Sequence, residues 1–211
     1  MKNKKVFLML ILLMEVLTLT AQIEKGRFFV NGLNVMSVQV GSIKDAFGES
    51  NSKSTFSSFS IGPFASIGPF SSIPSLVNSP SLNYSFSDHL TGGIFLNLAL
   101  SGGRDTLKYT NSGIIVGPTI RYYLIAKKKF MPFIEGLAGI GSTSTGYGTL
   151  PADKSTVFGW HLGTGATYFF SPKVGADFTL GYENIEEKIK GSSTKSTFGF
   201  AQFGVGVLVI F

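Results

Sequence analysis

The sequence predicts an all-β fold, an eight-stranded antiparallel up-and-down transmembrane β-barrel. Residues 197–211 alternate between an apolar face that ends on Phe211 and a face of small or polar residues such as Gln202 and Gly204. This period of two suits a strand with lipid on one side and a packed lumen on the other. No apolar run after the first 21 residues approaches the roughly 20 residues of a spanning helix. A closed barrel is the other architecture that satisfies every backbone group in lipid.

The first residues have the layout of a secretory signal peptide. Three lysines precede an apolar stretch over residues 6–19, and Thr20 and Ala21 follow it. Because this stretch is short for a spanning helix, a retained anchor is the weaker alternative. We predict cleavage after Ala21, which divides the chain into a signal peptide (1–21) and one domain (22–211). The sequence has no cysteine that could carry the lipid of a lipoprotein.

Charge and cysteine content exclude several classes of protein. The predicted signal peptide holds three of the 18 basic and one of the 12 acidic residues, which leaves a net charge of +4. The charges are scattered, and the densest basic cluster, residues 127–129, falls in a predicted turn. Solvated or headgroup-facing lysines therefore explain it better than a nucleic-acid surface does. Without cysteine, disulfide scaffolds and thiolate metal sites are also excluded.

Apolar alternation bounded by turn residues predicts eight strands. Most of them suit a tilted spanning strand of about 9 to 11 residues. In chain order they cover residues 27–40, 79–86, 90–101, 113–124, 130–141, 156–170, 174–182 and 197–211.

The connections between these strands alternate between two kinds. Residues 87–89, 125–129 and 171–173 are short and have turn chemistry, whereas the stretches after Val40, Ser101, Gly141 and Tyr182 are longer and rich in polar residues and glycine. An up-and-down barrel has short turns at one end and free loops at the other. Both mature termini then lie at the short-turn end, which we expect to be periplasmic, and the longer loops are extracellular.

Aromatic residues collect beside the short turns, at Tyr84 and Phe86, at Tyr122 and Tyr123, and at 168–170. Rings at one level predict an aromatic girdle at a membrane interface. The alternative is that tyrosine and phenylalanine simply favour strands.

The predicted first loop, about 41–78, contains a tandem repeat. Phe59–Pro63, Phe64–Pro69 and Phe70–Pro74 are nearly identical copies, each ending on proline. Proline removes a donor from a strand ladder, so we favour an extended first loop with edge-strand character. The alternative is a duplication that lets the second strand choose among registers.

Phasing the apolar residues toward lipid leaves a polar set facing the lumen. Since eight strands enclose only enough space for side chains, Arg121 with Glu135 and Asp177 is expected to form a hydrogen-bonded plug rather than a channel lining. The predicted lumen network consists of Asn83, Asn97, Arg121, Glu135, His161 and Asp177.

The first strand does not follow a single phase. Asn34 falls on the face of Val30 and Met36, while Leu33 falls on the face of Asn31. A bulge near Gly32 would restore the alternation.

No cluster of residues specifies a reaction. Neither His89 nor His161 has a second histidine nearby for a metal site. A hydrolase that uses His161, Asp177 and a serine is conceivable, but no nucleophile elbow is present. The glycines at 163 and 165 lack the rest of a dinucleotide fingerprint and are interpreted as packing glycines. We therefore predict no catalytic residue, no metal and no cofactor.

Two stretches carry a resemblance to a known family. Residues 80–90 (PSLNYSFSDHL) and 132–141 (PFIEGLAGIG), together with the terminal Phe211, resemble small outer-membrane β-barrel proteins of Gram-negative bacteria, especially the porin-family β-barrel domain of Bacteroidota. The likeness covers about residues 27–211. It implies an outer-membrane location and recognition of Phe211 as a C-terminal assembly signal.

The leading functional hypothesis is a non-enzymatic integral outer-membrane protein with a filled lumen and a structural or surface-interaction role. The alternatives are a barrel enzyme acting on lipid or lipopolysaccharide, and a narrow transport or ligand-binding barrel. A soluble lipocalin-like barrel is the alternative fold, with the opposite polarity of its two faces. The expected partners are outer-membrane lipid, lipopolysaccharide and the barrel assembly machinery. We expect a monomer that binds no nucleic acid.

Overall fold

The computed structural model describes residues 23–44, 53–61, 76, 79–104, 108–147, 152–192 and 195–211. All regular secondary structure in these residues is β strand. Within the same residues no helix has the length and apolar character needed to cross a membrane. The strands are β1 (Phe28–Lys44), β2 (Lys53–Ile61), β3 (Ser81–Ser85), β4 (Leu90–Arg104), β5 (Lys108–Tyr123), β6 (Phe130–Tyr147), β7 (Asp153–Phe169), β8 (Val174–Ile189) and β9 (Lys195–Ile210).

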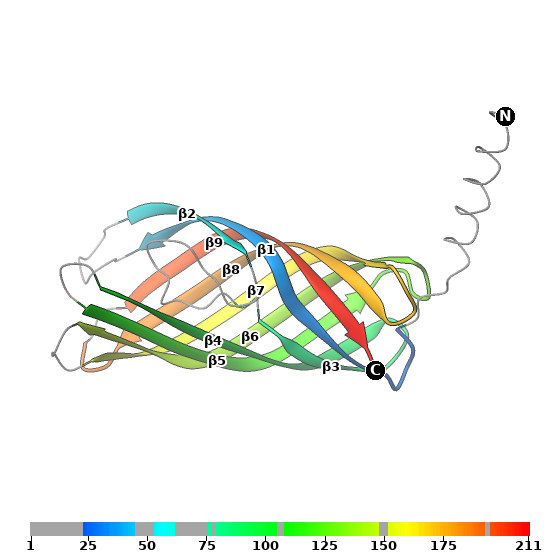
Figure 1. Cartoon of the computed structure of the whole chain (residues 1–211), viewed down its shortest axis with the longest axis horizontal. Helices are drawn as coiled ribbons and strands as arrows, with labels where there is room; N and C mark the ends of the chain where they lie inside the picture. The colour runs from blue at the N-terminus through cyan, green and yellow to red at the C-terminus, as the bar shows by residue number, and fades with distance from the viewer. Residues whose placement is uncertain are drawn as a thin grey trace, which may run out of the picture.

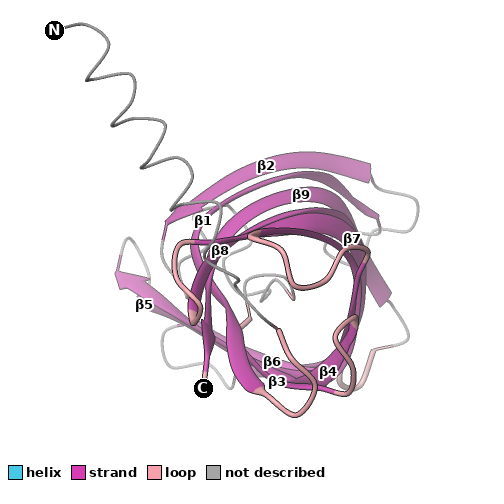
Figure 2. Ribbon diagram, turned by 90° about the vertical axis from the view of Figure 1, so that its right-hand side faces the viewer, coloured by secondary structure: helices cyan, strands magenta, loops and turns pink. Residues whose placement is uncertain are grey.

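The strands form a closed antiparallel ring. From β3 to β9 each strand pairs with the next in sequence, and β1 pairs with β9 along nearly its whole length. Figure 1 shows the tilted strands from the side, and Figure 2 shows the ring from one end. The predicted up-and-down barrel is confirmed.

The second position in the wall differs from the prediction because two strands share it. The edge of β1 that faces away from β9 pairs with β3 over Phe28–Asn31 and with β2 over Met36–Lys44. Within the predicted loop 41–78, residues 41–44 continue β1, and Lys53–Ile61 form β2, an additional strand at the edge of the sheet. The first copy of the tandem repeat begins in β2, and the other two copies lie outside the described residues.

The short connections agree with their predicted turn chemistry. Ser87 Oγ accepts hydrogen bonds from the backbone N–H groups of His89 and Leu90, and Ser171 Oγ accepts from those of Lys173 and Val174. These connections define the short-turn end of the barrel, where the C-terminus also lies (Figure 1). The opposite end is called the loop end below.

Several strands continue toward the loop end beyond their predicted limits. β6 extends to Tyr147 and β8 to Ile189 through residues that were expected to be loops. Serine and threonine residues within 142–147 fit a strand whose outer face meets water, because β-branched residues favour strands and hydroxyls remain solvated. The wall thus extends past its apolar belt.

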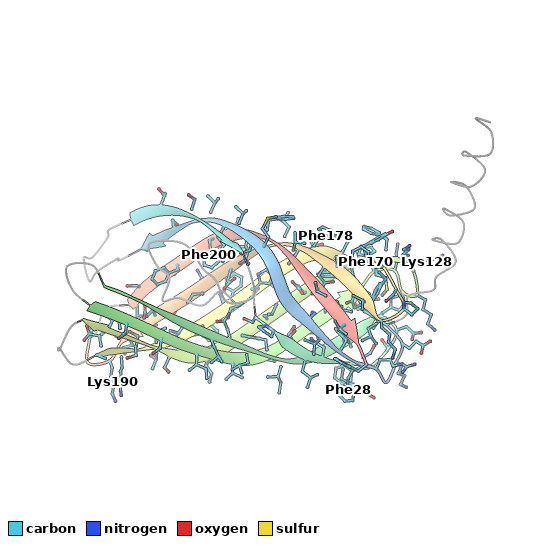
Figure 3. The ribbon with its side chains drawn as sticks, viewed as in Figure 1. Phe28, Lys128, Phe170, Phe178, Lys190 and Phe200 are labelled. Atoms are coloured by element: carbon cyan, nitrogen blue, oxygen red, sulfur yellow. The ribbon has the colours of Figure 1, made fainter. Side chains whose placement is uncertain are left out.

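The two faces of the wall have the polarity of a membrane barrel. Outward-facing apolar side chains are exposed, as in Ile94 (63%), Ile140 (67%) and Leu162 (63%), whereas the lumen-facing Arg121 is 5% exposed. Side chains surround the wall in Figure 3, where Phe28, Phe170 and Lys128 are labelled toward the short-turn end. A soluble barrel would show the reverse distribution.

The irregularity predicted in the first strand is present. The β1–β9 register shifts between Val30 and Leu33, and again between Asn34 and Met36. Gly32 has a φ of +77°, which favours glycine. The strand thus has two bulges, one more than predicted. After them the alternation resumes with Ser37 facing the lumen.

Candidate functional site

The lumen is filled by side chains in three successive layers. An apolar cluster closes the short-turn end, a polar layer follows, and a second apolar cluster lies toward the loop end. The short-turn cluster consists of Ile23, Phe29, Tyr123, Met131, Phe133, Phe169, Leu208 and Ile210. The loop-end cluster consists of Leu76, Phe95, Ile115, Val157, Ile185, Phe198 and Phe200.

Arg121, Glu135 and Asp177 form a central ion-pair network in the polar layer. Arg121 donates to Glu135 Oε2 from Nε at 3.0 Å and from Nη2 at 2.7 Å, and its Nη1 donates to Asp177 Oδ2 at 2.7 Å. Thr167 Oγ1 donates to the other oxygen of Asp177 at 2.5 Å. The guanidinium also lies 3.7 Å from the centroid of the Phe133 ring. These contacts join four strands, β5 to β8, through the lumen.

Strand register accounts for this arrangement. Arg121 in β5 lies directly opposite Glu135 in β6, and Thr167 in β7 lies opposite Asp177 in β8. Inward-facing residues at opposite positions have closely spaced Cβ atoms. Because all three charged side chains are about nine-tenths buried or more, each charge depends on the others for its solvation.

His161 lies beside this network without a hydrogen bond of its own. Its Nε2 is 3.7 Å from Glu135 Oε1, and among the described residues neither ring nitrogen has a hydrogen-bond partner. The imidazole occupies space that Cβ atoms at Gly163 and Gly181 would fill. The interpretation of Gly163 as a packing glycine is therefore correct.

No metal site is found in the described part of the chain, where no three histidine or acidic side chains are suitably placed.

The two asparagines of the predicted network lie in the lumen but apart from its charged members. Asn83 Nδ2 donates to Asn31 Oδ1 at 2.7 Å and to Ser81 Oγ at 2.9 Å. Asn97 Nδ2 donates to Ser79 Oγ at 3.0 Å. The bond to Asn31 joins β3 to β1, and the bond from Asn97 joins β4 to the residue that precedes β3 by two positions.

Sequence reasoning missed a buried contact between the first loop and the wall. Glu183 belongs to the stretch after Tyr182 that was predicted to be a loop, but it lies in β8 with its side chain buried. Its Oε1 accepts a hydrogen bond from the backbone N–H of Leu76 at 2.5 Å. Leu76 belongs to the loop-end cluster and is fully buried. The one feature of the sequence that could have indicated this burial is that Leu76 is an apolar residue in a stretch rich in serine and proline.

Little free space remains beside the ion-pair network. A cavity of about 20 Å³ is lined by residues that include Asn31, Ser81, Arg121 and Asp177. This volume holds roughly one water molecule. The small size of this cavity and the two apolar clusters together indicate that the lumen is packed with side chains.

A second set of ion pairs lies on the rim of the short-turn end. Lys127 Nζ is 2.8 Å from Asp88 Oδ2, and the backbone N–H of Lys25 donates to Asp88 Oδ1 at 3.3 Å. The hydrogen bond from Lys127, followed by that from Lys25, lowers the pKa of Asp88 below its usual value. These contacts join the N-terminal segment to two turns.

Comparisons with known proteins give a fold and no family. No protein-family model and no curated protein matches the sequence. The crystal structure of Neisserial surface protein A is similar with a TM-score of 0.50 and 16% identity, over 87% of this chain and 97% of that one. OprG of Pseudomonas aeruginosa has a TM-score of 0.47 and 13% identity, over 89% of this chain and 97% of that one. Ail of Yersinia pestis has a TM-score of 0.46 and 11% identity, over 87% and 99%. The chain has the fold of Gram-negative outer-membrane β-barrel proteins.

Proposed function

We propose that this protein is a non-enzymatic, integral outer-membrane β-barrel with a closed lumen and a structural or surface-interaction role in the cell envelope. The observation that carries the proposal is the polarity of the wall. Exposed apolar side chains surround a lumen that contains a buried ion-pair network and two apolar clusters. Burial of the outer face in lipid is the arrangement that removes this apolar surface from water.

Rings near the short turns support a membrane boundary at that level. Phe28 and Tyr84 are in contact with ring centroids 5.0 Å apart, and Tyr168 and Phe170 with centroids 5.4 Å apart. Lys129 Nζ lies 5.3 Å from the Tyr168 ring. Aromatic rings beside cationic side chains suit the headgroup region.

The loop end supports a surface-interaction role. Beyond the apolar belt, the outward positions of β7 and β8 carry polar residues such as Lys154, Thr156 and Lys188. These strands remain paired there, so the wall presents a rigid polar rim in place of free loops. We place this end outside the cell and both mature termini in the periplasm. Lipopolysaccharide is the expected neighbour of the rim, and the assembly machinery is the expected partner of Phe211 during insertion. We expect a monomer.

A filled lumen argues against catalysis. His161 is buried, and the guanidinium of Arg121 is bound by two carboxylates. His161→Phe should therefore leave the lipid A acylation pattern of the host membrane unchanged in mass spectra. Altered acylation would favour a lipid-modifying enzyme.

Two measurements test the main proposal. Outer membranes from cells that express the chain should contain a band that shifts between boiled and unboiled samples on SDS gels. The purified, folded protein should produce no steady conductance in planar bilayers. A soluble periplasmic band that does not shift would contradict the membrane location, and a stable conductance would contradict the closed lumen.

A further inference from the structure

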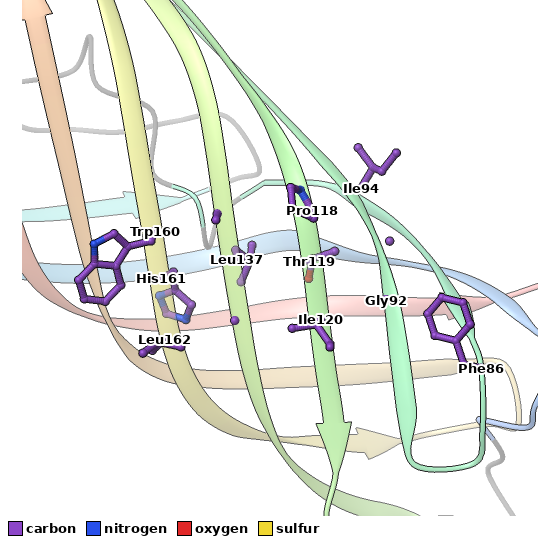
Figure 4. A pocket seen from close by; sticks show the side chains of 13 residues that line it. Phe86, Gly92, Ile94, Pro118, Thr119, Ile120, Leu137, Trp160, His161 and Leu162 are labelled. Atoms are coloured by element: carbon purple, nitrogen blue, oxygen red, sulfur yellow. The ribbon is translucent and has the colours of Figure 1, made fainter.

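The outer, lipid-facing side of the barrel has a large apolar recess. It has a volume of about 830 Å³ and lies across β4, β5, β6 and β7 (Figure 4). Phe86 lies at one end and Trp160 at the other. The residues between them include Gly92, Pro118, Gly136 and Ala138.

Small residues at adjacent outward positions create this recess. Gly92 lies opposite Ile120, which in turn lies opposite Gly136, so a row across three strands contains two residues without a side chain. The next row contains Pro118 and Ala138 in place of large apolar residues. Elsewhere on the wall, outward positions hold side chains such as Ile140 and Leu180. The recess is thus a local feature of β4–β7.

Basic side chains lie next to the turn that contains Phe86. Phe86 packs over Gly92 and belongs to the turn whose Asp88 forms an ion pair with Lys127. Lys128 is the exposed neighbour of Lys127. Among the described residues no acidic side chain lies within ion-pair distance of Lys128. Lys128 therefore carries an uncompensated positive charge at the short-turn end of the barrel, the same end as the turn that contains Phe86.

We propose that this recess is a binding site for one anionic phospholipid of the leaflet at the short-turn end. An acyl chain lies between Phe86 and Trp160, and the phosphate of the headgroup is bound by Lys128. The apolar lining matches a hydrocarbon chain, and the charge of Lys128 matches that of the phosphate. The site is continuous with the lipid-facing belt. The inference rests on the proposed membrane location.

Trp160 makes the site directly observable because it is the single tryptophan of the chain. The folded protein is reconstituted in phosphatidylcholine vesicles that contain either brominated phosphatidylglycerol or brominated phosphatidylcholine at equal mole fraction. Bromine quenches tryptophan fluorescence on contact. We expect stronger quenching by the brominated anionic lipid, that is, a quenching ratio above one.

Two pairs of variants assign this preference to the recess. Ala138→Leu fills the recess and should reduce the ratio to one, whereas Ala201→Leu, at an exposed outward position of β9, should leave it unchanged. Lys128→Gln should also reduce the ratio. Lys190→Gln, at the opposite end of the barrel in Figure 3, should not.

The outcomes separate this inference from the proposed membrane location. Equal quenching by the two lipids in the unmodified protein overturns the lipid site and leaves the membrane barrel intact. A preference that survives both Ala138→Leu and Lys128→Gln also overturns it. Absence of quenching by either lipid contradicts the membrane location itself.

Discussion

Leu76 donates its backbone N–H to the buried carboxylate of Glu183 at 2.5 Å. The two residues are 107 positions apart in the sequence, and their contact holds Leu76 inside the lumen. An unsatisfied buried N–H costs about 1–3 kcal/mol. Glu183→Ala should therefore speed hydrogen exchange of the Leu76 amide by roughly tenfold, since about 1.4 kcal/mol corresponds to that factor.

Hydrogen-exchange mass spectrometry of the protein in detergent micelles checks this prediction. Glu183→Gln keeps an acceptor oxygen and should restore much of the protection. Glu186→Ala is the control, because Glu186 is partly exposed and pairs with Lys195. An unchanged exchange rate in Glu183→Ala would show that Leu76 is held by packing alone.

The central ion-pair network should respond strongly to the loss of its cation. Arg121→Met leaves Glu135 and Asp177 buried without a counter-charge, and the free energy of unfolding should fall by about 3–5 kcal/mol. Urea unfolding in lipid vesicles measures the change. Arg27→Met is the control, because the exposed pair of Arg27 with Glu24 contributes about 0–1 kcal/mol.

A neutral version of the same network tests the cause. Combining Arg121→Met with Glu135→Gln and Asp177→Asn removes every charge and should recover most of the lost stability. If the triple variant were no more stable than Arg121→Met, lost packing against Phe133 would be the cause instead.

The bulge at Gly32 lies in close contact with the backbone of Ser79. A Cβ at Gly32 would overlap the backbone oxygen of Ser79. Gly26 has a similar φ of +89°, but no atom of the described residues lies within 4 Å of its Cβ position. Gly26→Ala should thus cost only the left-handed backbone penalty, about 1–2 kcal/mol. Gly32→Ala should cost more, because the chain at Ser79 must move. Equal unfolding midpoints for the two variants would contradict this expectation.

Asp88 gives the short-turn rim a defined pH dependence. Its pKa lies below the usual 3.8 in the folded protein, mainly because Lys127 donates a hydrogen bond to it. A lowered pKa adds stability above the unfolded value, and this contribution is lost as the pH falls through the folded value. Lys127→Gln should raise the pKa of Asp88 toward its usual range, as measured by carboxyl NMR titration in micelles. A pKa that stays unchanged would identify the Lys25 amide as the dominant contact.

The inward and outward faces of the wall could be predicted because the alternation of residues along each strand determines them. In β7, His161 and Thr167 face inward while Leu162 faces outward, as expected from a period of two. The same period brought Arg121, Glu135 and Asp177 to one lumen, although it could not specify their hydrogen bonds.

Glu183 and β2 show what local pattern could not supply. Glu183 lies in a stretch rich in glutamate and lysine, which indicates a solvated loop when no partner is known. Its burial depends on Leu76, a contact between distant parts of the chain. β2 was not predicted as a separate strand because it pairs with the same edge of β1 as β3 does. The strand that became β3 had been expected to occupy that edge alone.

The ring closes through the pairing of β1 with β9, in which Gln39 Nε2 donates to Gln202 Oε1 at 3.2 Å across 163 positions of sequence. This seam cannot form until the last strand has been made and delivered. Pairings over such sequence separations form slowly, because the connecting chain must first lose its conformational entropy. During that interval the edges of β1 and β9 are open templates for pairing with other chains. The slowest step of folding therefore coincides with the greatest risk of aggregation, and a factor that shields both edges would act on yield more than on stability.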